Sequence, residues 1–217
     1  MELLQEDLQY VLRRLPKIVE DMLVESRGSL IMTGDFIRSC IVKETPSDID
    51  IFSKTRDIAK KAAEKLETKI DKCLLTETDY TYILFGASQF PIQFIYQQKY
   101  KKPEDILPFF DFTIVKAMVW FSRNNWHSLC GERFYQDLAA KRLAYCYPEQ
   151  IEEVGASLLR VLKFHHRGYR IPLDSLAGVT ARLFSGIGLE KTGTEERRMG
   201  HAISKLLCKT NPLTLSM

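Results

Sequence analysis

Two aspartates separated by one residue, Asp48 and Asp50, are the residues best suited to chemistry in this sequence. They begin the stretch Asp48-Ile49-Asp50-Ile51-Phe52, whose alternation of polar and apolar residues predicts a strand. Residues i and i+2 of a strand point to the same face, so both carboxylates project together while Ile49 and Ile51 enter the core. Adjacent carboxylates repel each other unless a cation neutralises them, and hard oxygen ligands suit Mg²⁺ or Mn²⁺. The pair therefore predicts a divalent metal site.

A glycine turn upstream predicts a place for phosphates. Residues 29–32 form a short apolar run typical of a buried strand, Gly34 ends it, and a helix is expected from about residue 36 to 42. Backbone amides at a helix start behind a glycine can approach a triphosphate closely. We expect Ser29, Gly34 and Arg38 to hold the phosphates, with Lys54, just past the Asp48–Phe52 strand, as a further candidate.

Three blocks of the sequence resemble the head and neck of class II tRNA nucleotidyltransferases and bacterial poly(A) polymerases, members of the polymerase-beta superfamily. Gly34-Asp35-Phe36-Ile37-Arg38-Ser39, a spacer and then Asp48-Ile49-Asp50 are similar to their Gly-Gly-x-Val-Arg-Asp and Asp-x-Asp motifs. Asp111-Phe112-Thr113-Ile114 resembles their Arg-Arg-Asp-Phe-Thr motif, and residues 159–171 resemble their neck helix. The resemblance covers roughly residues 28 to 172. It implies an α/β (α+β) fold, with a small mixed β-sheet head followed by a helical neck.

The resemblance also implies an activity. The expected reaction is the transfer of a nucleoside monophosphate from a nucleoside triphosphate to a hydroxyl acceptor, an RNA end or a protein. Asp48 and Asp50 are the expected ligands of Mg²⁺ (or Mn²⁺). The family often has a third acidic ligand on a neighbouring strand, where this sequence has Gln93, so Asp111 is the available substitute; its alternative role is the N-cap of a following helix. For Arg38, a phosphate contact and a salt bridge to the Asp48–Asp50 strand are both open.

The departures from the family pattern limit that reading. The second glycine is Asp35, and Phe109–Phe110 replace two arginines. Val154 and Ser157 occupy the neck positions that read the incoming base in the family, and neither side chain can form bidentate contacts with a base edge. The sequence ends at Met217 without the long helical body that holds tRNA in the family, so we expect neither CCA addition nor processive tailing.

Two other functions fit the same residues. The first is a catalytically inactive descendant that binds a nucleotide, an RNA or a protein partner, which the lost arginines and base reader favour. The second is a toxin-like or defence-type transferase that modifies tRNA ends or a protein hydroxyl. The intact Asp48–Asp50 pair argues against the inactive form, because two adjacent charges are costly to keep without a cation.

The elements predicted around the motifs divide the chain into a head domain over residues 1–124 and a helical neck over 125–217 that packs on it. In the head we expect an N-terminal helix broken at Pro16, a helix over 56–66, and a hairpin of strands over 80–85 and 92–96. Helices are expected over 112–121, 133–145, 150–168 and 195–209.

Composition sets the remaining expectations. The chain has 31 Lys and Arg against 28 Asp and Glu, a net charge of +3, and its basic groups, including Lys163–Arg170 with His165 and His166, are typical of solvated surface. Nucleic acid is permitted but not indicated. Five cysteines without a CxxC pair argue against a zinc ribbon or a disulfide framework. We expect a cytoplasmic protein with no membrane partner, and the sequence does not indicate its oligomeric state.

Overall fold

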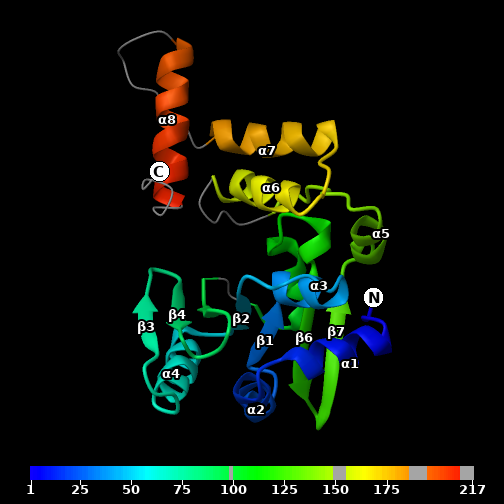
Figure 1. The fold of residues 1–217 in the computed structure, drawn as a ribbon, viewed down its shortest axis with the longest axis vertical. Helices are drawn as coiled ribbons and strands as arrows, with labels where there is room; N and C mark the ends of the chain where they lie inside the picture. The colour runs from blue at the N-terminus through cyan, green and yellow to red at the C-terminus, as the bar shows by residue number, and fades with distance from the viewer. Residues whose placement is uncertain (98–99, 149–154, 186–194, 211–217) are drawn as a thin grey trace. The chain divides into compact units, whose positions relative to one another are not determined.

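The computed structural model describes residues 1–97, 100–148, 155–185 and 195–210 (Figure 1). The chain forms two compact units. Residues 1–110 and 114–134 make up one, here called the head unit, and residues 111–113 with 135–217 make up the other, the helical unit. The boundary predicted between residues 124 and 125 falls instead in the turn of a hairpin within the head unit.

The head unit is built on one seven-stranded mixed sheet with the order β3-β4-β5-β2-β1-β6-β7. Strands β2 and β5 run parallel, and every other neighbouring pair is antiparallel. This arrangement confirms the predicted fold class. The strands are β1 (Leu30–Thr33), β2 (Ile49–Ser53), β3 (Leu74–Glu77), β4 (Thr81–Phe85), β5 (Ile92–Ile95), β6 (Ala117–Ser122) and β7 (Asn125–Cys130).

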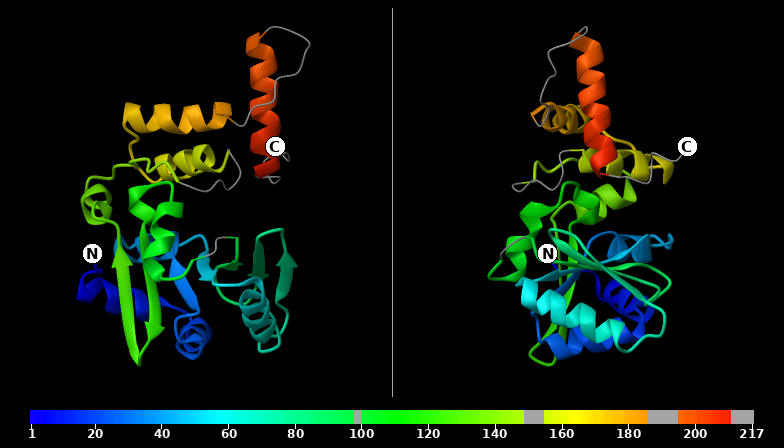
Figure 2. Two further views of the ribbon diagram at one scale, coloured as in Figure 1. Left: turned by 180° about the vertical axis from the view of Figure 1, so that it is seen from behind. Right: turned by 90° about the vertical axis from the view of Figure 1, so that its left-hand side faces the viewer.

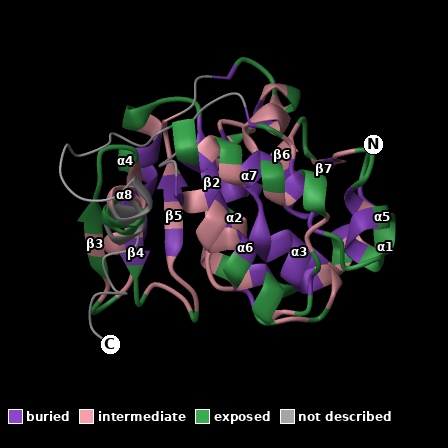
Figure 3. Ribbon diagram, turned by 90° about the horizontal axis from the view of Figure 1, so that it is seen from above, coloured by how far each residue is buried: buried purple, intermediate pink, exposed green. Residues whose placement is uncertain are grey.

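Four helices pack on this sheet. Pro16 separates the first two, as predicted, because a proline cannot donate the backbone hydrogen bond that a continuous helix needs. They are α1 (Gln5–Arg14), α2 (Lys17–Ser26), α3 (Asp35–Ile41) and α4 (Arg56–Glu67). Helix α4 lies against β2 to β5, and α2 against β1 and β6, as Figures 1 and 2 show from several directions. Helix α3 contacts β2, β6 and α1, and is almost entirely buried (Figure 3).

The two faces of the sheet follow from the alternation of side chains along each strand. In β2, Ile49 and Ile51 are fully buried, and so are their neighbours Met32 and Phe94 on the adjoining strands. Asp50 and Phe52 point to the other face. There Phe52 packs in an apolar cluster that the short 3₁₀ helix η1 (Pro103–Phe109) helps to cover. The cluster consists of Ile31, Phe52, Tyr100, Ile106 and Met118.

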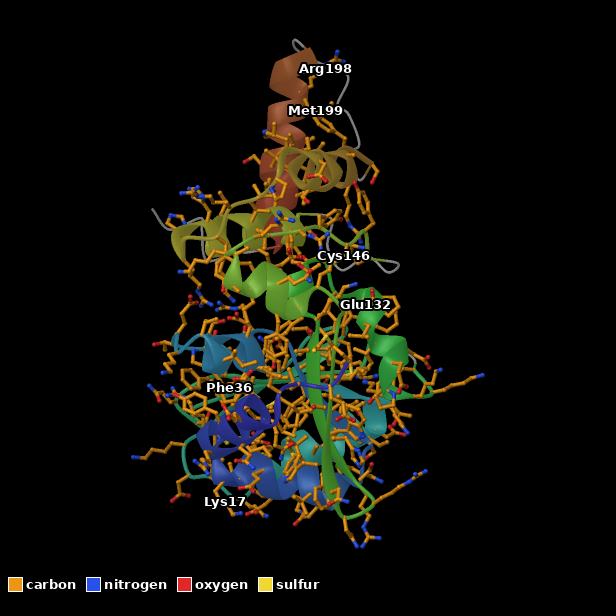
Figure 4. The ribbon with its side chains drawn as sticks, turned by 90° about the vertical axis from the view of Figure 1, so that its right-hand side faces the viewer. Lys17, Phe36, Glu132, Cys146, Arg198 and Met199 are labelled. Carbon is orange, nitrogen blue, oxygen red and sulfur yellow. The ribbon has the colours of Figure 1, made fainter. Side chains whose placement is uncertain are left out.

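Aromatic packing ties α3 to the loop before β5. Phe36 on α3, marked in Figure 4, is 1% exposed and meets Phe90 edge to face at 6.3 Å between ring centroids. This contact and the strand ladder together fix the turn between β1 and α3, which lies next to the two aspartates.

The helical unit contains α6 (Ala156–His166), α7 (Leu173–Ser185) and α8 (Glu195–Thr210). Helix α5 (Phe134–Ala139) begins at the last residue of the head unit, and the 3₁₀ turn η2 (Thr113–Val115) lies where the chain returns to it. Helix α6 contacts both α7 and α8.

Three predicted elements were wrong or incomplete. Residues 112–121 do not form a helix but the turn η2 and strand β6, because Ala117, Met118 and Val119 are buried on both faces of the sheet. A short, fully apolar run does not distinguish a buried strand from a buried helix. The helix predicted over 133–145 shortens to α5, and strands β3 and β7 were not predicted. Part of the helix predicted over 150–168 falls in residues 149–154, outside the described residues.

Truncating a side chain should cost more on the buried central strand β2 than on the exposed edge strand β3. Ile51→Ala should lower the free energy of unfolding by about 2–5 kcal/mol, because it leaves a cavity beneath the helices at a fully buried position. Leu74→Ala on edge strand β3, where the side chain is 63% exposed, should change it by less than about 0.5 kcal/mol. Urea unfolding followed by circular dichroism measures both, and equal losses would contradict the burial described for these two positions.

Candidate active site

Asp48 and Asp50 lie where β2 begins, at the centre of the sheet. Asp48 directly precedes the strand and Asp50 is its second residue, and both are partly exposed. Asp50 lies beside Gln93 on β5 and beside Thr33 on β1. The Gln93 amide Nε2 donates to Asp48 Oδ2 at 3.3 Å, which places both carboxylates on the face that carries Gln93. The same-face arrangement expected from their spacing is therefore present.

The end of β1 brings a glycine and a hydroxyl to Asp50. Gly34 has φ 77° and ψ −139°, and a Cβ on it would lie 3.2 Å from Asp50 Oδ2. Only glycine permits this close approach without strain. The hydroxyl of Thr33 is fully buried and makes no hydrogen bond within the described part of the chain. Such an orphaned polar atom is costly, and its residue is the direct strand partner of Asp50.

The amide of Gly34 does not take up the predicted role directly. Its N–H donates to the carbonyl of Ala117 at 3.1 Å, extending the ladder between β1 and β6. A phosphate contact through this amide would require breaking that bond. Because Gly34 has no Cβ, it leaves space beside the Asp50 carboxylate.

Arg38 is the centre of a buried ion network. Its guanidinium is 0% exposed, and Nε donates to Asp35 Oδ1 at 2.6 Å while Nη1 donates to Glu44 Oε2 at 2.7 Å. Nη2 donates to Ser39 Oγ at 2.7 Å. A phosphate contact would require the guanidinium to leave these partners, so its placement favours the salt-bridge alternative, with carboxylates other than those of the Asp-x-Asp strand. Asp35, where the related families have a second glycine, supplies the principal partner.

Ser47 connects this network to Asp48. Its hydroxyl lies 3.0 Å from Asp35 Oδ2 and 3.1 Å from Asp48 Oδ1. A hydroxyl has one proton and donates to one carboxylate at a time. Asp48 is thus held from two sides, by Ser47 and by Gln93, in a defined orientation.

Ser29 and Lys54 lie at the opposite end of the strand pair. Ser29 precedes β1, its hydroxyl donates to the Ser26 carbonyl at 2.7 Å, and its carbonyl accepts from the Lys54 amide at 3.4 Å. Thr33, which adjoins Asp50, is four residues further along, about 13 Å at the rise of a strand. The structure does not bring these two predicted phosphate contacts to the aspartates, and neither is part of the site proposed below.

Asp111 belongs to the helical unit. It is 4% exposed, and Arg160 Nη1 on α6 donates to its Oδ2 at 2.9 Å. The alternative of an N-cap for a helix over 112–121 is wrong, because that helix does not form. Its role as a third acidic ligand stays a prediction.

The donor set at Asp48 and Asp50 fits Mg²⁺ or Mn²⁺. Within the described residues, no group of three or more His, Cys, Asp or Glu is arranged to hold a metal. Mg²⁺ commonly takes only one or two protein carboxylates and completes its octahedron with water and substrate phosphates. Two partly exposed carboxylates beside the orphaned Thr33 hydroxyl match that mode, and the Gln93 amide can present its oxygen after a simple flip.

Cysteine chemistry does not compete at this site. Cys40 on α3 is 0% exposed, and burial raises the pKa of its thiol to about 11. Burial also raises the pKa of the Cys130 thiol. A thiol that ionises so reluctantly is a poor nucleophile near neutral pH.

Two contributors to the site were missed from the sequence. Thr33 and Ser47 carry ordinary hydroxyls whose importance depends on strand register and on the fold of the loop before β2. A single sequence gives no signal for either. Of the base-reading positions, Val154 lies outside the described residues and Ser157 is buried on α6. No helix among the described residues is long and apolar enough to cross a membrane.

The Arg38 network predicts a large structural cost. Arg38→Met should lower the free energy of unfolding by about 3–5 kcal/mol, because it leaves the buried Asp35 carboxylate without its cation. The double variant Arg38→Met with Asp35→Asn should recover part of this loss. Chemical denaturation of the three proteins measures both effects, and an Arg38→Met variant as stable as the parent would contradict a structural role.

The Gly34 turn predicts a second cost with an internal control. Gly34→Ala should lower the free energy of unfolding by about 1–3 kcal/mol, from the left-handed backbone and the contact with Asp50. Gly200→Ala on α8, where an added Cβ meets no atom within 4 Å, should instead raise it by about 0.5–1 kcal/mol. Thermal melts of the two variants give the comparison, and the same sign for both would count against the described turn.

Comparison with known proteins agrees with this architecture. Residues 4–141 match the model of the Gabija anti-defense 2 family, Gad2. A search of curated proteins finds no match. The solved structures that resemble the chain include CCA-adding enzymes, and the chain spans about half of their length.

Three of those structures illustrate the likeness. The Thermotoga maritima CCA-adding enzyme complexed with tRNA has a TM-score of 0.58 and 18% identity, over 82% of this chain and 45% of that one. A CCA-adding enzyme in complex with ATP gives 0.62 and 17%, over 93% and 49%. Another, with CTP, gives 0.59 and 19%, over 95% and 50%. The chain therefore shares its fold with part of these CCA-adding enzymes. Because the family model matches well over half of the sequence, the chain belongs to the Gabija anti-defense 2 (Gad2) family.

Proposed function

We propose that this protein is a metal-dependent nucleotidyltransferase that transfers a nucleoside monophosphate from a nucleoside triphosphate to a hydroxyl acceptor. One observation carries the proposal: Asp48 and Asp50 share one face at the start of the central strand, beside the Gly34 turn, in a nucleotidyltransferase fold. The structural neighbours include complexes with ATP and CTP, which supports a nucleotide as the donor.

Asp48 and Asp50 are the residues that would hold Mg²⁺ (or Mn²⁺). When bound, such a metal supplies positive charge that neutralises phosphate oxygens and makes the α-phosphorus more electrophilic. The protein's part is to hold the two carboxylates in place. Gln93 and Ser47 orient Asp48 through hydrogen bonds of 3.3 Å and 3.1 Å, and the Thr33 hydroxyl retains a proton to donate toward Asp50 or a phosphate oxygen.

The reaction itself is a displacement at phosphorus. The acceptor oxygen forms a bond to the α-phosphorus, the bond from that phosphorus to the bridging oxygen breaks, and pyrophosphate leaves with its electron pair. The acceptor hydroxyl loses its proton to solvent. Positioning contributes most to such a reaction, because attacking and leaving oxygens must lie in line. Asp48 and Asp50, held at the centre of the sheet, would fix the position of the triphosphate relative to the acceptor.

The family name gives the proposal a biological setting. A family that counters Gabija defence requires a means of disabling it, and we propose that covalent transfer of a nucleotide to a hydroxyl of an RNA or a protein is that means. Like the toxin-like or defence-type transferase considered from the sequence, such a protein would modify an RNA end or a protein hydroxyl, but its role would be to counter a defence system and not to provide one. The missing base-reading pair at Val154 and Ser157 predicts little preference among the four nucleoside triphosphates.

One observation favours a second function, binding without catalysis. Gln93 occupies the strand position next to Asp50 where a third carboxylate would promote deprotonation of the acceptor, and its amide nitrogen is turned to Asp48. Asp111 is engaged by Arg160 in the helical unit. A protein in this state would bind a nucleotide or a partner but transfer nothing.

The expected result for the parent protein is stabilisation by metal and nucleotide together. Saturating Mg²⁺ or Mn²⁺ with a nucleoside triphosphate should raise the melting temperature, since a ligand at a hundredfold excess over its Kd stabilises by about 2.7 kcal/mol. Asp48→Asn with Asp50→Asn should abolish this shift while leaving the ligand-free protein as stable as before or more so, because it removes repulsion between neighbours. Differential scanning fluorimetry checks this.

The same variant separates the two functions. Transfer of label from α-³²P nucleotides to RNA or to Gabija proteins should fall at least about a hundredfold, because metal charge stabilisation contributes several kcal/mol. The matched control, Asp71→Asn with Asp79→Asn, removes two exposed carboxylates of the head unit and should leave transfer unchanged. A metal-dependent thermal shift without any transfer by the parent would favour binding without catalysis, and no shift at all would contradict both the transferase and the binding of a nucleotide.

A further inference from the structure

The helical unit carries a concentrated basic surface. Two segments of sequence that contain no Asp or Glu, residues 141–148 and 155–173, meet there. The surface carries five Lys and Arg side chains and two histidines. We call this set the basic cluster; it consists of Lys141, Arg142, Lys163, His165, His166, Arg167 and Arg170.

Backbone pairing brings the two segments together. Arg142 and Arg170 face each other in a parallel bridge. The bridge is closed by the Arg170 amide donating to the Lys141 carbonyl and the Leu143 amide donating to the Arg170 carbonyl, both at 2.8 Å. Both arginines are exposed. Like charges placed directly opposite each other on paired strands destabilise the pairing unless an anion lies between them.

Lys141 is held in an uncommon backbone conformation. Its φ of 46° lies in the left-handed region, where a lysine is strained and glycine is not. Its Nζ donates to the Arg167 carbonyl at 3.4 Å and lies 5.8 Å from the centroid of the Tyr169 ring. The strained backbone therefore presents an ammonium group at the centre of the cluster.

Buried aromatic rings fix the cations from beneath. Phe164 and Tyr169 are each 1% exposed, and Lys163 and Arg167 lie 5.8 Å and 6.0 Å from the centroid of the Phe164 ring. Contacts of this kind restrict long flexible side chains, which lowers the entropic cost of binding an anion. Phe164 and Tyr169 are too buried to stack with a ligand, so their contribution is to position the cations.

The dipole of α6 accounts for part of this pattern only. Cations at a helix C-terminus are favourable, which explains Lys163 and the two histidines in the last turn. Lys141 and Arg142 come from another segment and Arg170 lies past the helix. Arg142 has an ion pair, its Nε lying 3.8 Å from a carboxylate oxygen of Asp137, which is 2% exposed. The helix dipole and this ion pair leave the position of the exposed Lys141 and Arg170 unexplained.

We propose that the basic cluster binds the phosphodiester backbone of a nucleic acid. Several cations within reach of one another, from separate segments and with ordered side chains, suit a chain of regularly spaced phosphates. Its lysines and arginines would contact phosphates and not base edges, which predicts binding with little sequence preference. The inference concerns binding alone and holds whether or not the head unit transfers nucleotides.

The test measures binding with neither metal nor nucleotide present. Fluorescence anisotropy with an unstructured 20-nucleotide RNA, and with DNA of the same sequence, should show binding by the parent that weakens steeply with salt. Arg142→Gln with Arg170→Gln should raise Kd at least about tenfold and lower the slope of log K against log salt by about 1.4, for two phosphate contacts on a single strand. The DNA and RNA titrations identify which nucleic acid is preferred.

Matched variants make the result specific. Lys101→Gln with Lys102→Gln removes the same charge from exposed positions of the head unit and should leave Kd within about twofold. Lys141→Gly should raise the melting temperature, because it relieves the left-handed backbone, and yet weaken binding. Asp48→Asn with Asp50→Asn should bind RNA like the parent, which separates this inference from the proposed transferase activity.

Three outcomes would overturn the inference. They are no binding of either nucleic acid at low salt, equal losses in the Arg142/Arg170 and Lys101/Lys102 variants, and displacement of RNA by poly-glutamate at an equal concentration of charge. The last result would show a general attraction for acidic polymers and not recognition of phosphates. An unfolded arginine variant is recognised by its melting curve, and Lys141→Gly then supplies the test.

Discussion

Repulsion between two carboxylates on one strand face is the constraint around which the head unit is arranged. Asp48 and Asp50 begin the central strand of a seven-stranded sheet, with their charges on the same side. Such a pair lowers stability unless something opposes the repulsion. Around it the chain places a glycine turn without a Cβ, a hydroxyl with no hydrogen bond within the described structure, and the amide of Gln93. In the proposed function, each of these would make room for a cation or orient a ligand.

The buried ion network beneath the turn follows from the same constraint. Arg38, Asp35 and Glu44 are expensive to bury, and their mutual hydrogen bonds offset much of that cost. Through Ser47 the network reaches Asp48, so the buried ion pair helps to orient one of the two carboxylates of the proposed metal site. The arginine shared with the related families is therefore important here for holding the site together.

Much of the head could be predicted because its signals are local. The Asp48-x-Asp50 alternation, the glycine turn and the break at Pro16 each depend on neighbouring residues, and the structure has all three. Strand β6 was mistaken for a helix because a strand buried on both faces has no alternating pattern to read. Strand β3 was missed because it is short, exposed and at an edge.

The site was harder to predict than the fold, because it depends on which strand ends meet. Ser29 and Lys54 looked close to the aspartates along the sequence, but the antiparallel register of β1 and β2 places them at the other end. The same register brings Thr33 to Asp50, and no local sequence pattern predicts this pairing. The basic cluster has the same origin: its histidines and helix residues were visible as a charged run, whereas Lys141 and Arg142 join them only through the bridge to Arg170.

A structure of the protein with Mn²⁺ and a non-hydrolysable nucleoside triphosphate tests the central claim most directly. Anomalous scattering locates Mn²⁺ without reference to any assumed ligand. The account predicts a manganese peak at about 2.0–2.2 Å from carboxylate oxygens of both Asp48 and Asp50, with triphosphate oxygens completing its coordination. A triphosphate bound elsewhere, or manganese that contacts neither aspartate, would contradict it.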